Sequence, residues 1–229
     1  MKFVAIILCI IALVLAAIAY YFYNNNIQTK NELNFKIGSL EQQKAALENE
    51  LEIKISEVSK EKEEQIERLK NAYDKLVLDM EKEIEEGQIQ ITQLADRLSV
   101  SMVDRILFPS GKAEITPDGL KVLERVGNVL KNTENKIIRV EGHTDNVAIH
   151  SKLQEQFPTN WELSAARAIN VVRFLEDNVG IQAVRLQAIG MSEYHPVASN
   201  KTSAGRSQNR RIELILLPEI AGEIYSPSE

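Results

Sequence analysis

The sequence predicts an α+β fold, in which a compact domain with a sheet on one side and helices on the other follows a transmembrane helix and a long coiled-coil helix. Three observations predict it: an uncharged apolar run near the N-terminus, a heptad pattern without proline behind it, and alternating strand and helix patterns in the second half. They divide the 229 residues into a transmembrane helix at 1–23, a coiled-coil spacer at 24–100, a globular domain at 101–218 and a disordered tail at 219–229.

Residues 3–23 form an apolar run of about 21 residues, and about 20 suffice to span a bilayer as a helix. Lys2 precedes the run, so the positive-inside rule puts the N-terminus in the cytoplasm and everything after Asn24 on the far side of the membrane. We therefore expect a single-pass membrane protein. A cleavable signal peptide is the alternative, because Ala17-Ile18-Ala19 has the small-x-small pattern of a cleavage site.

Residues 31–98 contain no proline and are rich in Glu, Lys, Gln, Leu and Ile. Apolar residues recur there at alternating steps of three and four, slip in phase once, and continue past Gly87, a weak point for a helix. The pattern comprises Leu33, Ile37, Leu40, Leu47, Leu51, Val58, Ile66, Leu69, Tyr73, Leu76, Met80, Ile84, Ile91, Leu94 and Leu98. This narrow stripe predicts a coiled coil, and a parallel homodimer suits chains that share a membrane. A single solvated helix held by Glu–Lys pairs is the alternative.

The second half of the chain alternates between strand and helix patterns. An apolar-polar alternation at 103–108 predicts a strand, and Thr116-Pro117 begins a helix whose apolar residues face a core. A helix is also predicted at 163–175, and the remaining strands at 137–141, 185–189 and 211–217. About four strands alternating with helices predict the compact sandwich.

Five motifs follow one another in this half, at 108–117, 141–145, 160–168, 190–196 and 209–211. They include Glu-Gly-His-Thr-Asp at 141–145 and Asn-Arg-Arg at 209–211. With these motifs in order, residues 102–218 resemble the OmpA-like peptidoglycan-binding domain of OmpA C-terminal domains, peptidoglycan-associated lipoproteins and MotB-type flagellar stator proteins. The resemblance implies a β/α/β/α/β fold that holds the stem peptide of peptidoglycan non-covalently, commonly through diaminopimelate.

The resemblance also assigns roles to individual residues. Asp145 matches the aspartate that receives the ammonium group of the ligand, and Arg167 matches the arginine that pairs with its carboxylate. A planar guanidinium suits that task because it forms two parallel hydrogen bonds to a carboxylate. The supporting residues are Thr144 and Asn146 beside the aspartate, Asn160 at the start of a helix, and Arg210 in the motif that closes the pocket.

Each assignment has a structural alternative. Asp145 and Thr144 fit a turn after a strand, Arg167 fits a surface salt bridge, and Asn160 fits a helix N-cap. Arg210 and Arg211 alternate across a strand, so only one of them can face the pocket. The chain also departs from compact family members between Asp145 and Asn160, where it is longer and has Ala148 in place of a common glycine. This insertion is more similar to the stator branch.

Several function classes are disfavoured. The net charge of −6 argues against a nucleic-acid surface. His143, His150 and His195 lack metal-ligand spacing, so we expect neither a metal nor another cofactor, and the single cysteine, Cys9, allows no intrachain disulfide. An enzyme would need catalytic residues that the motifs do not offer, since Glu141 and Asp145 are neighbours along one strand and no candidate catalytic pair faces across a cleft.

Together with these patterns, the resemblance implies a coiled-coil-spaced tether that is anchored in a bacterial inner membrane and binds peptidoglycan through a periplasmic domain. A flagellar-stator-like or secretion-machine envelope anchor is the alternative, and a peptidoglycan-cleaving enzyme is the weaker one. Proton conduction by a stator needs an ionisable residue in the transmembrane helix, and residues 3–23 contain none.

Overall fold

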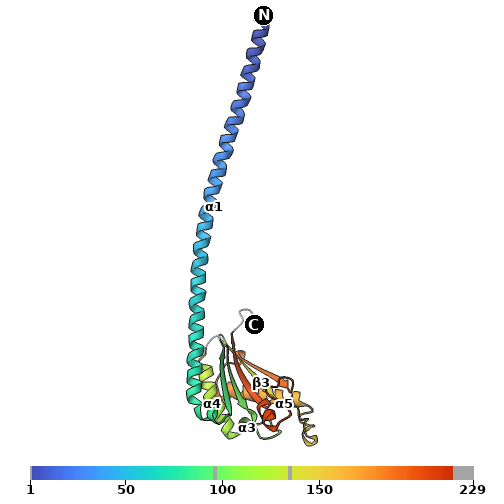
Figure 1. Ribbon diagram of the computed structural model, residues 1–229. Helices are drawn as coiled ribbons and strands as arrows, with labels where there is room; N and C mark the ends of the chain where they lie inside the picture. Colours follow the sequence, from blue (N-terminus) through green and yellow to red (C-terminus); the bar gives the residue numbers. More distant parts are fainter. Residues whose placement is uncertain (1, 95–96, 134–135, 219–229) are drawn as a thin grey trace. The chain divides into compact units, whose positions relative to one another are not determined.

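The computed structural model describes residues 2–94, 97–133 and 136–218, which form two compact units, Met1–Glu61 and Lys62–Glu229 (Figure 1). The tail predicted at 219–229 lies outside the described residues. The helices and strands are α1 (Lys2–Asp79), α2 (Glu81–Glu85), β1 (Ile89–Leu94), β2 (Arg97–Val103), α3 (Asp104–Leu107), α4 (Pro117–Lys131), β3 (Lys136–His143), α5 (Asn160–Phe174), β4 (Leu186–Ser192), α6 (Ser203–Asn209) and β5 (Arg211–Pro218).

The first unit consists of residues of helix α1 alone. Its apolar stripe is exposed, with Leu47 70% accessible, and salt bridges one turn apart join Lys44 to Glu48 and Lys54 to Glu50. Both features agree with the helical prediction for 24–79, and neither tests whether a second helix covers the stripe. Within the described part of the chain, no helix combines the length and apolar character that crossing a bilayer requires. The transmembrane helix at 1–23 stays a prediction.

The helical prediction is wrong beyond residue 86. Gly87 adopts a left-handed backbone with φ of +64°, and β1 and β2 then form an antiparallel hairpin in which Ile89 pairs with Met102. Apolar residues at 89 and 91 and at 98, 100 and 102 alternate with polar ones, which is the period of a strand with one buried face. Ile91, Leu94 and Leu98 fitted the heptad only because steps of three and four recur by chance in so short a stretch.

The end of α1 packs into the globular unit. Leu69, Leu76 and Met80 are fully buried in the same core as the sheet. Arg125 of α4 also contacts this region, because it donates to the carbonyl oxygen of Asp79 over 2.8 Å and pairs with Glu83. The prediction that residues 66–80 serve a coiled-coil interface is therefore wrong. The phase slip after Val58 separates the exposed part of the stripe from the part that faces the domain core.

The sheet has five strands in the order β1-β2-β5-β3-β4, and β3 pairs in parallel with β4 and antiparallel with β5. Alternate residues of β2, β3 and β5 join one core with α4, α5 and the end of α1, so these helices cover one face. The core strand residues are Leu98, Val100, Met102, Ile138, Val140, Ile212, Leu214 and Leu216. The α+β prediction is confirmed, with one strand more than expected.

Residues 104–107 form the short helix α3, so the strand predicted at 103–108 is wrong. The chain leaves β2 at Val103, and the amide of Phe108 donates to the carbonyl oxygen of Asp104 over 2.7 Å to close a single helical turn. Leu107 and Phe108 are both buried. A stretch of six residues with mixed polarity fits one helical turn as well as a short strand. The turn allows the consecutive residues Leu107 and Phe108 to be buried together.

Both long helices of the domain begin with side-chain caps. Thr116 accepts a hydrogen bond from the amide of Gly119 over 3.0 Å, as predicted for the start of α4. Thr159 caps α5 in a capping box with Glu162, so the interpretation of Asn160 as the N-cap is wrong. Because Thr159 and not Asn160 caps the helix, the Asn160 side chain can make other contacts.

Helix α5 lies unusually close to β3. A Cβ atom added to Gly142 would lie 2.2 Å from the carbonyl oxygen of Ser164, a backbone atom. Only glycine permits this approach without a shift of the helix. The contact sets the distance between the end of β3, which leads into Thr144 and Asp145, and the face of α5 that carries Arg167.

We predict that Leu76→Ala destabilises the globular domain by about 2–5 kcal/mol, because it leaves a cavity beside α4 in a fully packed core. Denaturant unfolding followed by Trp161 fluorescence measures this. Leu47→Ala removes the same side chain from an exposed position of α1 and should change the domain by less than about 0.5 kcal/mol. Equal effects of the two substitutions would contradict the packing of α1 into the domain.

Candidate ligand-binding cleft

A cleft of about 500 Å³ opens where the ends of β3 and the start of β5 meet α3 and α5. Four segments line it: the turn after β2, the loop after β3, one side of α5 and the region of α6. Its walls include Asp104, Phe108, Thr144, Asp145, Val147, Ile149, Asn160, Arg167, Arg206 and Arg210. The structure thus brings five of the six predicted site residues to one cavity.

Asp145 stands at the centre of the cleft in a fixed orientation. Its Oδ1 atom accepts a hydrogen bond from the amide of Val147 over 3.0 Å, which closes a local turn. Its Oδ2 atom accepts from Nη1 of Arg210 over 2.5 Å. The turn predicted as a structural alternative is therefore present, and the same carboxylate also faces the cavity, so the two interpretations are compatible.

Arg167 is only 3% exposed, so the prediction that it forms a surface salt bridge is wrong. Its Nε atom donates to the carbonyl oxygen of Lys112 over 2.9 Å, and Nη1 donates to Oδ2 of Asp104 over 3.1 Å. The guanidinium also lies over the ring of Phe108, 5.0 Å from its centroid. Three contacts therefore hold the planar group in one orientation at the wall of the cleft.

Asp104 is the residue that sequence reasoning missed. It is buried between two guanidiniums, because Nε of Arg210 lies 3.6 Å from its Oδ1 atom while Arg167 binds Oδ2. Two carboxylates and two guanidiniums therefore alternate in this part of the cleft, and Arg105 and Arg206 add further positive charge to its lining. The only sequence signal was an acidic residue between Val103 and Arg105, within the segment predicted as a strand.

Burial changes the proton affinity of this pair. The pKa of Asp104 is raised by burial, and the Arg167 and Arg210 guanidiniums oppose that rise. Burial likewise lowers the pKa of Arg167, against the effect of the Asp104 carboxylate. Each charge is costly on its own in this position and is maintained by the other.

Thr144 and Asn146 flank Asp145 and differ in their placement. The Thr144 side chain is buried in the wall of the cleft, and its hydroxyl has no hydrogen-bond partner among the described residues. A buried hydroxyl without a partner costs free energy, which a bound ligand would recover. Asn146 is exposed and is not among the residues that line the cleft.

Asn160 supports the loop that carries Asp145. Its Nδ2 atom lies within hydrogen-bonding distance of the carbonyl oxygens of Asp145 and Val147, at 3.3 and 3.1 Å, and of Oε2 of Glu193 at 2.7 Å. One amide group thus connects the start of α5 to both neighbouring loops. Asn160 therefore supports these loops and also lines the cleft.

Arg210 and Arg211 point to opposite sides, as the strand alternation predicted. Arg210 lines the cleft and its side chain is 36% exposed, the most accessible of the four charged groups. Arg211 is buried on the other side, where its Nε atom donates to Oε1 of Glu213 over 2.6 Å.

The insertion at 146–159 forms one wall of the cleft. Val147, Ala148, Ile149, His150 and Leu153 all line it, and Phe157 anchors the end of the loop in a small apolar cluster with Ala113 and Leu163. The wall is apolar next to the charged centre. Such a cleft has the chemistry to bind a ligand with an aliphatic chain and a zwitterionic head.

The fold and the site define a class: an α+β domain with a cleft at one end of its sheet that is lined by both aspartates and arginines. Residues 107–210 match the OmpA family model. Motility protein B of Bacillus subtilis is 36% identical over 161 residues, which cover 70% of this chain and 59% of that protein. The chain spans a little over half the length of the curated relatives it matches most strongly.

Solved structures agree with this match. A MotB-like protein from Desulfovibrio vulgaris superposes with a TM-score of 0.62 at 28% identity, covering 71% of this chain and 98% of that one. The cell wall anchor of the T6SS from Pseudomonas aeruginosa superposes with a TM-score of 0.57 at 30% identity, covering 63% and 97%. Residues 107–210 of the chain therefore form an OmpA-like domain.

We predict that Asp104→Ala destabilises the domain by about 3–5 kcal/mol, because it leaves the Arg167 guanidinium buried with its main counter-charge removed. Chemical denaturation at neutral pH measures the change. Glu114→Ala is the control, since that carboxylate is exposed and lies 3.8 Å from Lys112 at the surface. A loss below about 1 kcal/mol for Asp104→Ala would show that the pair does not hold the cleft together.

Proposed function

We propose that the protein is a cell-envelope tether that binds peptidoglycan non-covalently through this cleft. The observation that carries the proposal is the alternation of Asp145 and Asp104 with Arg167 and Arg210 around one cavity. A stem peptide with diaminopimelate presents an ammonium and a carboxylate on the same side-chain terminus. A cleft that offers both charges in fixed positions suits this zwitterion better than a singly charged ligand.

In this proposal Asp145 receives the ammonium group and Arg167 the carboxylate. Two nitrogens of Arg167 already bond to Lys112 and Asp104, which leaves its second terminal nitrogen for the ligand. Arg210 is the more accessible guanidinium and is paired with Asp145. When the ligand ammonium replaces it at Asp145, Arg210 moves toward the ligand carboxylate. Thr144 contributes its buried hydroxyl, Asn160 holds the loop, and Asn146 contributes at the rim.

The family relationship supports the same function. One similar structure is described as the cell wall anchor of the T6SS, and its identity of 30% extends over almost its whole length. We propose that the present chain likewise anchors to the cell wall, with residues 1–23 as a single inner-membrane span and the domain in the periplasm. Helix α1 serves as the spacer, and its exposed apolar stripe pairs with the same stripe of a second copy of the chain.

A stator-like role is the second candidate, favoured by the 36% identity to Motility protein B. The apolar segment argues against proton conduction, since residues 3–23 contain no ionisable side chain. We therefore propose anchoring as the shared element of both roles. Cleavage of peptidoglycan is disfavoured because both carboxylates of the cleft, Asp104 and Asp145, are paired with arginines, and Glu141 does not line it.

We predict that the full-length protein co-sediments with purified peptidoglycan sacculi and that Asp145→Asn weakens this binding roughly 10- to 150-fold. The substitution keeps the shape and removes the charge that pairs with an ammonium. Arg210→Lys should weaken binding roughly 10-fold, because lysine keeps the charge and loses the two-pronged hydrogen bond.

Asp118→Asn is the matched control, since Asp118 is an exposed residue of α4 outside the cleft, and it should bind as the native protein does. Free diaminopimelate should compete with the sacculi. Binding of Asp145→Asn at native strength, with its fold intact by circular dichroism, would show the ligand assignment to be wrong.

We predict that the native chain sediments as a dimer in detergent and that the double substitution Leu40→Lys and Leu47→Lys makes it a monomer. Both positions are exposed in α1 and lie on the stripe, where buried ammonium groups would oppose pairing. Asn49→Lys adds a lysine on the opposite side of the helix and should leave the dimer intact. A monomeric native chain would contradict the proposed spacer.

A further inference from the structure

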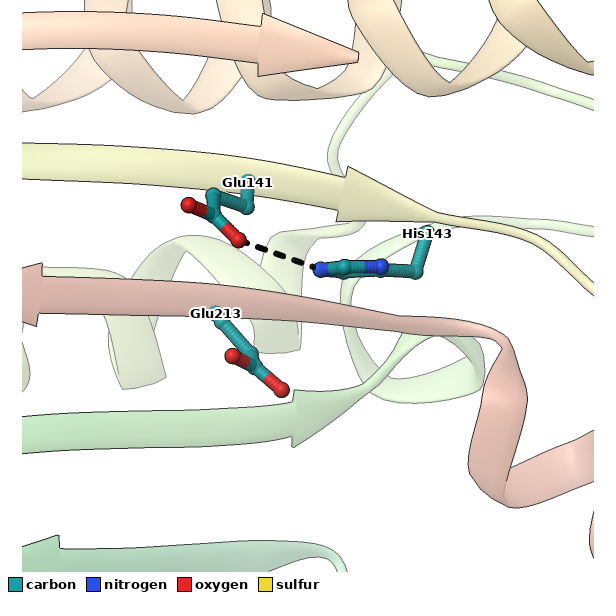
Figure 2. Close-up of side chains that lie close together, drawn as sticks. All are labelled: Glu141, His143 and Glu213. Carbon is teal, nitrogen blue, oxygen red and sulfur yellow. Dashed lines mark ion pairs between the residues drawn. The ribbon is translucent and has the colours of Figure 1, made fainter. Parts of the chain in front are cut away.

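On the sheet face away from the helices, Glu141, His143 and Glu213 lie close together at the junction of β3 and β5. One ligand atom from each lies within 4.8 Å of the others (Figure 2). Figure 2 shows Glu141 and His143 on one strand and Glu213 on the neighbouring strand, with their side chains gathered on one side of the sheet. None of the three lines the ligand cleft.

The register places like charges directly opposite one another. Glu141 pairs with Glu213, and His143 pairs with Arg211, across the antiparallel strands β3 and β5. Directly opposed like charges destabilise a sheet unless a counter-ion lies between them. Arg211 donates to Oε1 of Glu213 and so neutralises one carboxylate, whereas the Glu141 carboxylate lies 3.5 Å from the His143 imidazole.

His143 provides a second and independent observation. It is 3% exposed, and neither of its ring nitrogens has a hydrogen-bond partner among the described residues. Buried imidazoles normally bond through at least one nitrogen, and an unbonded pair costs free energy. The Nε2 atom lies 3.5 Å from Oε2 of Glu141, so this ring nitrogen points into the cluster.

We propose that Glu141, His143 and Glu213 bind a divalent transition-metal ion such as Zn²⁺. One imidazole and two carboxylates are a common donor set for this class of metal, at distances of about 2.0–2.2 Å. Tetrahedral ligands at that distance lie roughly 3.4 Å apart, so rotations of the two glutamates close the site. An imidazole donor favours zinc-like ions over Ca²⁺ and Mg²⁺, which take oxygen ligands.

His195 completes the set from the loop after β4. Its exposed ring lies at 78° to that of His143, with the centroids 6.4 Å apart. A side-chain rotation brings a second imidazole to the metal.

The site would brace the two strand ends that carry the cleft. His143 directly precedes Thr144 and Asp145, and Glu213 follows Arg210 by three residues. The sequence did not indicate this site, because Glu213 lies about 70 residues after Glu141 and His143 and comes close to them only in the folded sheet. The inference is independent of the identity of the ligand in the cleft.

The test is calorimetric titration of untagged, chelator-treated full-length protein with Zn²⁺, and with Co²⁺ as a spectroscopic probe. We expect one ion per chain and a visible Co²⁺ absorption typical of low coordination number. His143→Asn should weaken Zn²⁺ binding at least 100-fold, Glu213→Gln at least 10-fold and His195→Asn less. Ca²⁺ and Mg²⁺ should bind at least 100-fold more weakly.

His150→Asn is the matched control, because His150 is an exposed histidine on the cleft loop, and it should leave Zn²⁺ affinity unchanged. Circular dichroism of each metal-free variant verifies folding, and Glu213→Gln provides a second test should His143→Asn fail to fold. Absence of saturable Zn²⁺ binding by the native protein would overturn the proposal. Equal affinities of His150→Asn and Glu213→Gln would overturn it as well.

Discussion

The cleft depends on the buried ion pair between Asp104 and Arg167. These residues come from the turn after β2 and from the middle of α5, and their contact at 3.1 Å joins two segments about 60 residues apart. Neither charge is tolerable alone at that depth. Arg210 then bridges the pair to Asp145 at the end of β3. Every segment that lines the charged part of the cleft is therefore connected to this one interaction.

The same pair explains why the cleft is preorganised. A ligand meets the Arg167 guanidinium in a plane that is already fixed by the carbonyl oxygen of Lys112 and the ring of Phe108. Fixed groups lose little conformational entropy on binding, which favours affinity for a small charged ligand. Gly142 contributes by letting α5 approach β3 closely. The apolar insertion at 147–153 adds a wall that excludes water from one side.

Much of the domain could be predicted because its signals are local. The cap at Thr116, the period of the long helices and the alternation of β3 and β5 each depend on neighbouring residues. The errors arose where tertiary contacts decide. Residues 89–98 satisfied a heptad by spacing yet pair as a hairpin, and Leu69 and Leu76 satisfied a coiled-coil stripe yet fill a core. Motif order indicated Asp145 and Arg167, whereas Asp104 and the Glu141–His143–Glu213 cluster emerge only when distant strands are brought together.

The central claim is that the cleft recognises a zwitterion by both of its charges. Calorimetric titration of the full-length protein with diaminopimelate and with Nα-acetyl-lysine amide tests it most directly, because this blocked lysine keeps the side-chain ammonium and has no free carboxylate. The account predicts that diaminopimelate binds at least roughly 10-fold more tightly than the blocked lysine, since a charged pair with a guanidinium is lost. Equal affinities, or no binding of either, would contradict it.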